Sequence, residues 1–295
     1  MPPGTGTPVI RRTAPALLFA LVVACAAKVP APPPAGAPPT GTIAPGIEVR
    51  TTKRSDPVPL VTYLVTIDLA KASGEMKVVA DRDAEGNLLA ATVSDLAAKN
   101  RLLVAVNASF FEVPGGKYPK AGERAEVVGG LVLVGERIPS KAKSLALIDG
   151  ALCIDGRSVR IERGFECRGA AWGLASGPLL IEQGRRADTA FADAIFKSPR
   201  HPRTAVGVDP ARKKLWLLVA DGRQPGVSEG ATLDELKDLL AQAGATDALN
   251  LDGGGSSALV VRDPSGSLRI LNVPIHDRVP GLERPVVTAV GVGAS

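Results

Sequence analysis

The feature that most constrains the fold of this chain is a series of short, β-branched apolar runs, most of which are bounded by Gly, Asp or Asn. The run VPLVTYLVTIDL at 58–69 has the alternation typical of a half-buried strand. Six similar runs follow it, namely EMKVVADRD, VVGGLVLVGER, KSLALIDG, SVRIERG, KKLWLLVADGR and SALVVRD. Many short strands between turn residues predict an α+β domain with a mixed, mostly antiparallel sheet.

Two stretches have the pattern of a helix. TVSDLAAKN at 92–100 carries the cap candidates Thr92 and Ser94 ahead of a short apolar stripe. In TLDELKDLLAQAGA, Thr232 and Glu235 have the spacing of a capping box, and Gly244 is suited to the C-terminal cap. The apolar face of this second helix is expected to consist of Leu233, Leu236, Leu239, Leu240 and Ala243.

The N-terminus has the pattern of an export signal. Arg11 and Arg12 precede the apolar run APALLFALVVACAA, which is short for a membrane span and has the charge-then-apolar order of a secretory signal. The run contains LVVAC, which resembles the lipobox of bacterial lipoproteins. That resemblance implies a signal peptide over 1–24 and lipidation of Cys25. An ordinary signal peptide cut nearby is the alternative.

The segment 25–46 is rich in Pro, Ala and Gly and has almost no charge, which predicts a semi-rigid tether. Such a tether would hold residues 47–295, long enough for one domain, away from a membrane surface. We therefore expect an exported protein, lipid-anchored in a bacterial cell envelope. Ala26 lacks the acidic retention signal of inner-membrane lipoproteins, which favours the outer membrane.

Charge and cysteine content narrow the function classes. Without Arg11 and Arg12, 33 basic residues face 30 acidic ones, a net charge of +3 with no basic block, which argues against nucleic acid as a partner. Cys153 and Cys167 form an even pair in an exported domain, which favours a disulfide over two buried thiols. No zinc-site spacing is present.

Several apolar runs end in polar, glycine-bearing tips, where a sheet fixes functional groups and loops leave them accessible. Each tip alone is also compatible with an ordinary turn or a surface ion pair. The polar residues and glycines of these tips are Asn107, Ser109 and Glu112; Ser176 and Gly177; Arg203; Asp221 and Arg223; and Asn250, Asp252, Gly253, Gly254, Gly255, Ser256 and Ser257.

Together the tips predict an anion site. The Gly-Gly-Gly-Ser-Ser run can turn successive backbone N–H groups inward, and its hydroxyls add further donors. Arg203 and Arg223 could grip one phosphate. Asp221, Asp252 and Glu112 are the candidate carboxylates for acid–base chemistry.

Three sharper motifs do not fit. Ala258 stands where a nucleophile elbow needs its last glycine, and no lysine follows the glycines as a Walker motif requires. A histidine triad would have to use His201 or His276, and neither has a clear partner in the sequence.

The strings NASFF, SGPLL, HPRTAVGV, DGR and NLDGGGSS resemble, in content and order, the phosphodiester glycosidase family from about Val104 to the C-terminus. Ala108 stands in place of the glycine of the family's usual Asn-Gly-x-Phe-Phe. The resemblance implies hydrolysis of the bond between an anomeric carbon and a phosphate oxygen, in a sugar-1-phosphodiester or phosphorylated envelope glycan, with no required cofactor. We favour Asp252 over Asp221 for the chemistry, with Asp221 or Glu112 as alternatives if Asp252 only accepts hydrogen bonds from the glycine amides.

Two other functions stay open at this point. A phosphodiesterase that cleaves P–O bonds could use a divalent cation, Ca²⁺ or Mg²⁺, held by Asp221, Asp252 and Asn250. A non-catalytic envelope protein that binds anionic glycans could keep the same fold.

Overall fold

The computed structural model describes residues 1, 40–113, 117–140, 142, 145–192 and 199–294. The chain divides into two units, 1–33 and 34–295, and all of the elements below belong to the second. The expected signal peptide, the lipidation site Cys25 and most of the expected tether lie outside the described residues. Within the part of the chain that is described, no helix has the length and apolar character needed to cross a membrane.

The largest sheet has eight strands in the order β1-β2-β3-β16-β15-β17-β13-β14. Its strands are β1 (Gly41–Ala44), β2 (Ile47–Arg54), β3 (Leu60–Asp68), β16 (Lys214–Ala220), β15 (Arg203–Val208), β17 (Asp247–Asn250), β13 (Leu179–Glu182) and β14 (Arg185–Arg186).

Two five-stranded sheets complete the framework, in the orders β11-β10-β12-β8-β9 and β19-β18-β7-β22-β4. The first contains β11 (Ser158–Arg163), β10 (Gly150–Asp155), β12 (Trp172–Ser176), β8 (Leu131–Leu133) and β9 (Glu136–Ile138). The second contains β19 (Leu268–Ile270), β18 (Leu259–Arg262), β7 (Leu102–Asn107), β22 (Ala289–Gly293) and β4 (Met76–Val79).

Two small hairpins accompany these sheets, β5 (Asp81–Arg82) with β6 (Leu88–Leu89) and β20 (Ile275–His276) with β21 (Val279–Pro280). Neighbouring strands within each named sheet pair antiparallel. The predicted α+β class with mostly antiparallel sheet and few helices is therefore confirmed.

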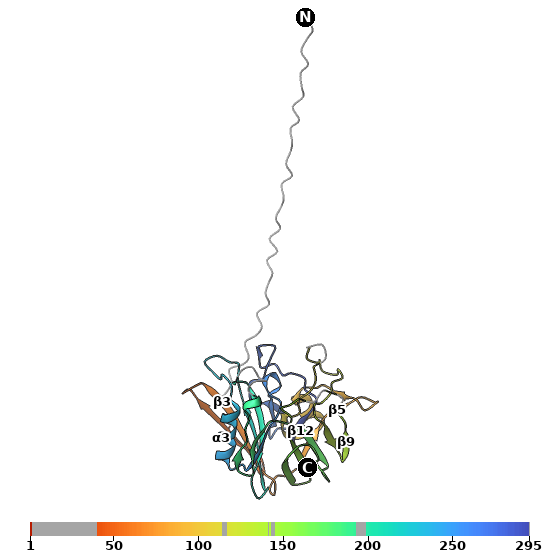
Figure 1. Cartoon of the computed structure of the whole chain (residues 1–295), viewed down its shortest axis with the longest axis vertical. Helices are drawn as coiled ribbons and strands as arrows, with labels where there is room; N and C mark the ends of the chain where they lie inside the picture. Colours follow the sequence, from red (N-terminus) through yellow and green to blue (C-terminus); the bar gives the residue numbers. More distant parts are fainter. Residues whose placement is uncertain (2–39, 114–116, 141, 143–144, 193–198, 295) are drawn as a thin grey trace. The chain divides into compact units, whose positions relative to one another are not determined.

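Helix α3 (Leu233–Ala243) covers one face of the eight-stranded sheet, beside β3 in Figure 1. The capping box is present, since the Thr232 hydroxyl accepts from the Glu235 N–H at 3.1 Å and the Glu235 carboxylate accepts from the Thr232 N–H at 2.8 Å. Gly244 ends the helix in the left-handed conformation with φ +107°. All three predicted end signals of this helix are confirmed.

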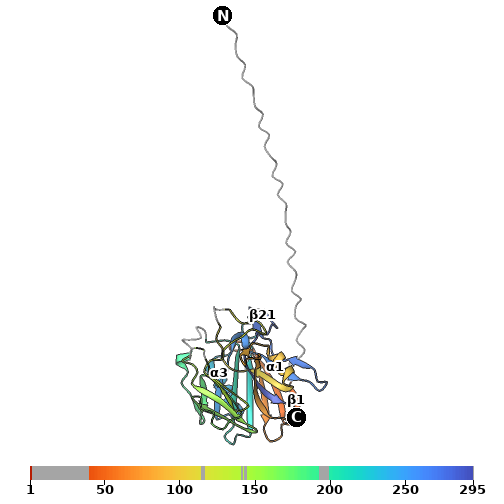
Figure 2. The same ribbon diagram turned by 90° about the vertical axis from the view of Figure 1, so that its right-hand side faces the viewer.

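Helix α1 (Val93–Lys99) packs on the sheet that contains β7, so Figure 2 shows α1 and α3 against different sheets. Thr92 is its N-cap and accepts from the Asp95 N–H at 3.0 Å. Of the two predicted cap candidates, Thr92 is confirmed, and Ser94 lies inside the first turn.

Strand β3 is buried on both faces, so the expectation of a half-buried strand is wrong. Val61, Val65 and Ile67 face the main core. Leu60 and Leu64 face the second core, which α3 closes. Alternate residues of β3 do face opposite sides of the sheet, but α3, which is distant in the sequence, covers the second side.

Two boundaries also differ from expectation. KSLALIDG forms no strand over its described residues before Gly150; Leu147 packs instead with Phe110 and Val128. The end of the expected tether belongs to the fold, since β1 pairs with β2 from Gly41 to Ala44. Backbone hydrogen bonding to the sheet explains why a weakly apolar segment is ordered there.

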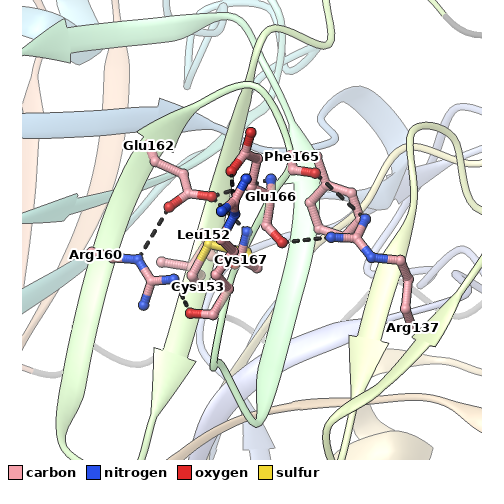
Figure 3. Close-up of a disulfide and its surroundings, with 9 residues drawn as sticks. Arg137, Leu152, Cys153, Arg160, Glu162, Phe165, Glu166 and Cys167 are labelled. Carbon is pink, nitrogen blue, oxygen red and sulfur yellow. Dashed lines mark hydrogen bonds and ion pairs between the residues drawn. A yellow bond between two sulfur atoms is a disulfide. The ribbon is translucent and has the colours of Figure 1, made fainter.

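Cys153 on β10 and Cys167 before β12 form a disulfide with Cα atoms 5.2 Å apart (Figure 3). The Glu162 carboxylate accepts from the Cys167 N–H at 2.6 Å, which fixes the backbone beside the bridge. Gly173 on the neighbouring strand makes room for it, because a Cβ there would lie 2.8 Å from the Cys167 Sγ. The pair expected from the sequence is thus joined in the structure.

Candidate active site

The glycine run follows β17 and forms a short 3₁₀ helix, η2 (Gly254–Ser256), before β18. Neighbouring segments hold its backbone on both sides. The Asp252 N–H donates to the Ala108 carbonyl at 2.9 Å, and the Gly254 N–H donates to the Pro202 carbonyl at 2.8 Å. The Asn107 side-chain amide donates to the Asp252 carbonyl at 2.6 Å. The loop is therefore fixed to the end of β7 and to the entry of β15.

Each of the three glycines has its own physical reason. A Cβ on Gly253 would lie 2.9 Å from the Pro202 carbonyl oxygen. Gly254 has φ +64°, and a Cβ there would lie 2.8 Å from the Arg223 Nη2. A Cβ on Gly255 would overlap the Arg284 guanidinium. The glycines thus let backbone and two arginines approach the loop. The predicted anion nest is wrong for most of the run, because the N–H groups of Gly253, Gly254, Ser256 and Ser257 donate to protein oxygens.

Arg223 and Arg284 form the cationic part of the site. Arg223 follows β16, is solvent-exposed and has φ +57°. Arg284 precedes β22, is 8% exposed, and donates from Nη1 to the Ser256 hydroxyl at 3.3 Å. Although Arg223 reaches solvent, partial desolvation of its side chain and the nearby Arg284 charge lower its pKa, while Tyr118 and Asp252 oppose that shift. The two guanidinium groups therefore lie close enough to repel each other, and both are of the type that pairs with phosphate or carboxylate.

Asp252 supplies the carboxylate of the site. It is half-buried and accepts from the Gly253 N–H at 2.8 Å and from the Ser256 hydroxyl. Burial raises the pKa of this carboxyl from 3.8 to about 6, against the opposing influence of Ser256, Arg284, Gly253 and Arg223. A carboxyl that titrates near pH 6 beside two guanidinium groups is suited to proton transfer.

Arg284 is enclosed by two aromatic residues. Its guanidinium carbon lies 3.6 Å from the centroid of the Tyr118 ring, and its Nε donates to the His276 Nδ1 at 3.3 Å. The Tyr118 and His276 rings meet edge to face with centroids 5.6 Å apart. The cluster therefore joins Tyr118, Arg223, the glycine loop with Asp252, His276 and Arg284.

Asp221 has a different role from the one considered in the sequence. Its carboxylate is buried and accepts from the Asn272 amide at 3.2 Å, the Val273 N–H at 3.0 Å and the Tyr63 hydroxyl at 3.3 Å. Burial raises the pKa of Asp221 to about 6, although these hydrogen bonds oppose the shift. The carboxylate anchors the segment after β19 and is saturated by protein donors, which makes it a poor metal ligand or catalytic group.

Four predicted ligand-binding side chains lie inside the protein and form hydrogen bonds with other protein groups. The Asn107 Oδ1 accepts from the Thr204 hydroxyl at 2.7 Å, and the Asn250 amide donates to the Gly177 carbonyl at 2.8 Å. The Ser176 hydroxyl donates to the Asn250 carbonyl at 2.8 Å. Arg203 is 2% exposed and donates to the carbonyls of Ala231 and Pro199. The prediction that these four side chains bind the ligand is therefore wrong: their hydrogen bonds stabilise the loops that form the site.

Gly177 and Ser257 are likewise interior. A Cβ on Gly177 would collide with the Leu147 carbonyl, so glycine is needed for backbone packing. The Ser257 hydroxyl is buried, and its carbonyl accepts from the Asn272 amide at 3.0 Å. Glu112 is solvent-exposed, and its backbone N–H donates to the Glu126 carbonyl at 2.9 Å. The contacts of the described residues do not place its carboxylate in the cluster.

The sequence reasoning missed Arg284 and Tyr118 and set His276 aside. Arg284 lies in GLERPVV, ahead of a strand, whereas the polar tips that predicted the site come after strands. Tyr118 lies in a loop with no pattern. The one signal for Arg284 in the sequence is an arginine between Glu283 and Pro285, and this signal is weak.

The described residues contain one cluster of three His, Cys, Asp or Glu side chains with metal-ligand spacing, Cys153, Glu162 and Cys167. Its two sulfurs are joined in the disulfide, so they are not free to bind an ion.

Comparison with known proteins gives a consistent result. A family model described as phosphodiester glycosidase matches residues 100–293. The bovine N-acetylglucosamine-1-phosphodiester alpha-N-acetylglucosaminidase is 28% identical over 188 residues, which are 58% of this chain and 33% of the bovine protein. This chain therefore spans about a third of that relative's length.

Solved structures share the fold. The catalytic domain of the zebrafish N-acetylglucosamine-1-phosphodiester alpha-N-acetylglucosaminidase, auto-inhibited by its pro-peptide, has a TM-score of 0.62 and 17% identity over 87% of each chain. A hypothetical protein from Synechocystis has a TM-score of 0.55 and 18% identity over 83% of this chain and 61% of its own. At these identities the likeness concerns the fold alone.

Proposed function

Because this chain belongs to the phosphodiester glycosidase family, we propose that it hydrolyses the bond between a sugar's anomeric carbon and a phosphate oxygen in a sugar-1-phosphodiester. The observation that carries the proposal is the convergence of Arg223 and Arg284 on the glycine loop beside Asp252. Two guanidinium charges and one carboxylate leave a net charge of +1, which complements the single negative charge of a phosphodiester.

The chemistry follows from that arrangement. A phosphate oxygen is a fair leaving group, so little acid assistance is needed, but negative charge on the phosphate grows as the bond breaks. Arg223 and Arg284 would stabilise that charge. The Asp252 carboxylate would take a proton from water as the water oxygen bonds to the anomeric carbon. The electron pair of the broken C–O bond stays on the phosphate, which leaves as a phosphomonoester.

N-acetylglucosamine is the sugar with which to begin, because the bovine relative is named for it. The export pattern around Arg11 and Cys25 supports an envelope-tethered protein acting on phosphorylated envelope glycans. The sugar, the glycan and the anchored location are all parts of this proposal.

The test uses the full chain and the methyl phosphodiester of N-acetyl-α-glucosamine 1-phosphate in ¹⁸O-labelled water. We expect free sugar that carries the label and unlabelled methyl phosphate. Label in the phosphate, with activity lost in EDTA, would instead establish a metal-dependent phosphodiesterase. Binding of the diester without turnover would make the site a recognition surface for anionic glycans.

Gly255→Ala is expected to lower kcat/KM by about 10- to 100-fold, because its Cβ displaces the Arg284 guanidinium from the loop. The matched control is Gly41→Ala, where a Cβ meets nothing within 4 Å and the backbone angle is ordinary. Steady-state kinetics of both variants check this prediction. Equal activity of Gly255→Ala and wild type would show that the position of Arg284 is unimportant for turnover.

A further inference from the structure

We propose that Tyr118 and His276 are positioning residues, which hold the Arg284 guanidinium in the orientation that binds phosphate. The proposal rests on the proposed function, in that Arg284 is taken as a phosphate ligand. Neither residue belongs to the polar strand tips that the sequence pattern pointed to.

Three contacts define the orientation of the guanidinium. Its face lies 3.6 Å from the Tyr118 ring centroid, its Nε donates to the His276 Nδ1 at 3.3 Å, and its Nη1 donates to the Ser256 hydroxyl at 3.3 Å. Because the guanidinium is planar, stacking of its face on Tyr118 together with the hydrogen bonds from Nε and Nη1 prevents it from rotating. Its Nη2 then lies where a Cβ of Gly255 would be. The donors that these contacts leave on Nη1 and Nη2 are therefore presented beside the glycine loop.

The contact to His276 specifies the state of the imidazole. Arg284 can only donate, so Nδ1 must accept and the proton of the neutral ring lies on Nε2. The Nε2 atom lies 3.5 Å from the Asp277 carboxylate. Burial and the Arg284 charge lower the pKa of His276, and Asp277 opposes that shift. The groups that face the imidazole are Arg284, Asp277 and Tyr118. Burial and the Arg284 charge favour the neutral ring that this geometry requires.

A tight hairpin places His276 against the loop. β20 and β21 pair His276 with Val279, and the two turn residues, Asp277 and Arg278, both have positive φ, +50° and +63°. Turns with two left-handed residues match the twist of a hairpin. β20 lies against η2, and Figure 2 shows β21 at the loop-rich end of the folded unit. The hairpin therefore fixes the imidazole at the edge of the site.

Packing alone does not account for Tyr118. Its side chain is 43% exposed, which is high for a large aromatic residue whose only task is to fill a core. One face of the ring covers Arg284, and its contacts with Phe111 and His276 are edge to face. This arrangement suits a residue that shields and orients a cation.

The test compares substitutions that differ in one property. His276→Asn keeps an acceptor near the Nδ1 position, whereas His276→Ala removes it. Loss of a hydrogen bond to a charged group predicts that His276→Ala lowers kcat/KM for the methyl phosphodiester by about 10- to 100-fold, with His276→Asn within about threefold of wild type. Tyr118→Phe keeps the ring and is expected to behave like wild type, whereas Tyr118→Leu loses about tenfold. Equal losses for His276→Ala and His276→Asn, or full activity of Tyr118→Leu, would overturn the proposal.

A second measurement separates this proposal from the proposed function. In ¹⁵N NMR of the full chain, the Arg284 Nε–H, assigned by its loss in Arg284→Lys, should be a resolved, slowly exchanging signal in wild type and His276→Asn. It should merge with the exposed arginines in His276→Ala. A resolved signal without turnover would refute the reaction and leave the positioning contact intact. Turnover with an Arg284 signal that is insensitive to His276→Ala would refute the positioning role.

Discussion

Asp252→Asn is expected to lower kcat by about 10²- to 10⁴-fold, the usual range for loss of a general base. KM should change little, since the amide fits the same space and Arg223 and Arg284 still bind the phosphate. The physical reason is that an amide cannot take the proton of the attacking water. Steady-state kinetics on the methyl phosphodiester measure both constants.

Glu112→Gln is the matched control for this substitution, because it also exchanges a carboxylate for an amide but on an exposed side chain outside the cluster. We expect it to keep wild-type kinetics. A variant Asp252→Asn with more than a tenth of wild-type kcat would show that the carboxylate only accepts hydrogen bonds from the glycine loop, as the sequence left open. A large loss in Glu112→Gln would return that residue to consideration.

The pH dependence provides a third observation on the same carboxyl. Burial raises the pKa of Asp252 to about 6, and the proposed base acts in its ionised form. Activity is therefore present above this pH and lost as the pH falls through it, so kcat/KM should rise to a plateau between pH 5 and about 7. Asp252→Asn should lack this limb. A kcat/KM that falls as the pH rises through 6 would instead indicate that Asp252 acts as an acid.

Asp221→Ala is expected to destabilise the protein by about 3–5 kcal/mol, because it leaves the Asn272 amide, the Val273 N–H and the Tyr63 hydroxyl without their buried acceptor. Through Asn272 and Val273, the Asp221 carboxylate holds the segment that leads to His276. Urea unfolding at pH 7 measures the difference in free energy. A loss below 1 kcal/mol would mean that Asp221 is not the anchor of this segment.

Asp221→Asn is the matched control, because its amide oxygen can keep the Asn272 and Val273 hydrogen bonds without a buried charge. The sign of its pH dependence follows from the raised pKa. Asp221 goes from 3.8 unfolded to about 6 folded, so the folded state binds more protons between these values and loses stability as the pH rises. Relative to Asp221→Asn, wild type should lose about 2 kcal/mol between pH 4 and pH 7. Turnover that falls as far in Asp221→Asn as in Asp252→Asn would exchange the roles assigned to the two carboxylates.

Much of the fold could be predicted because its signals are local. The capping box of Thr232 and Glu235 and the cap glycine Gly244 act within a few residues, so their pattern suffices to define α3. Alternation along β3 likewise predicts a strand. It does not predict what covers each face of the strand. β3 is buried on both sides because α3, which lies more than 160 residues later in the sequence, packs against the sheet that contains β3.

The site divides in the same way. By itself the sequence determined the glycine loop, Asp252, Arg223 and the family resemblance, since each of these rests on a short contiguous string such as NLDGGGSS or DGR. Only the tertiary structure decided that Asp221 and Arg203 are buried supports, and that Arg284 completes the cationic pair with Tyr118 and His276 around it. The physical reason is that the role of a polar side chain depends on burial and on partners from distant segments, which no short pattern encodes.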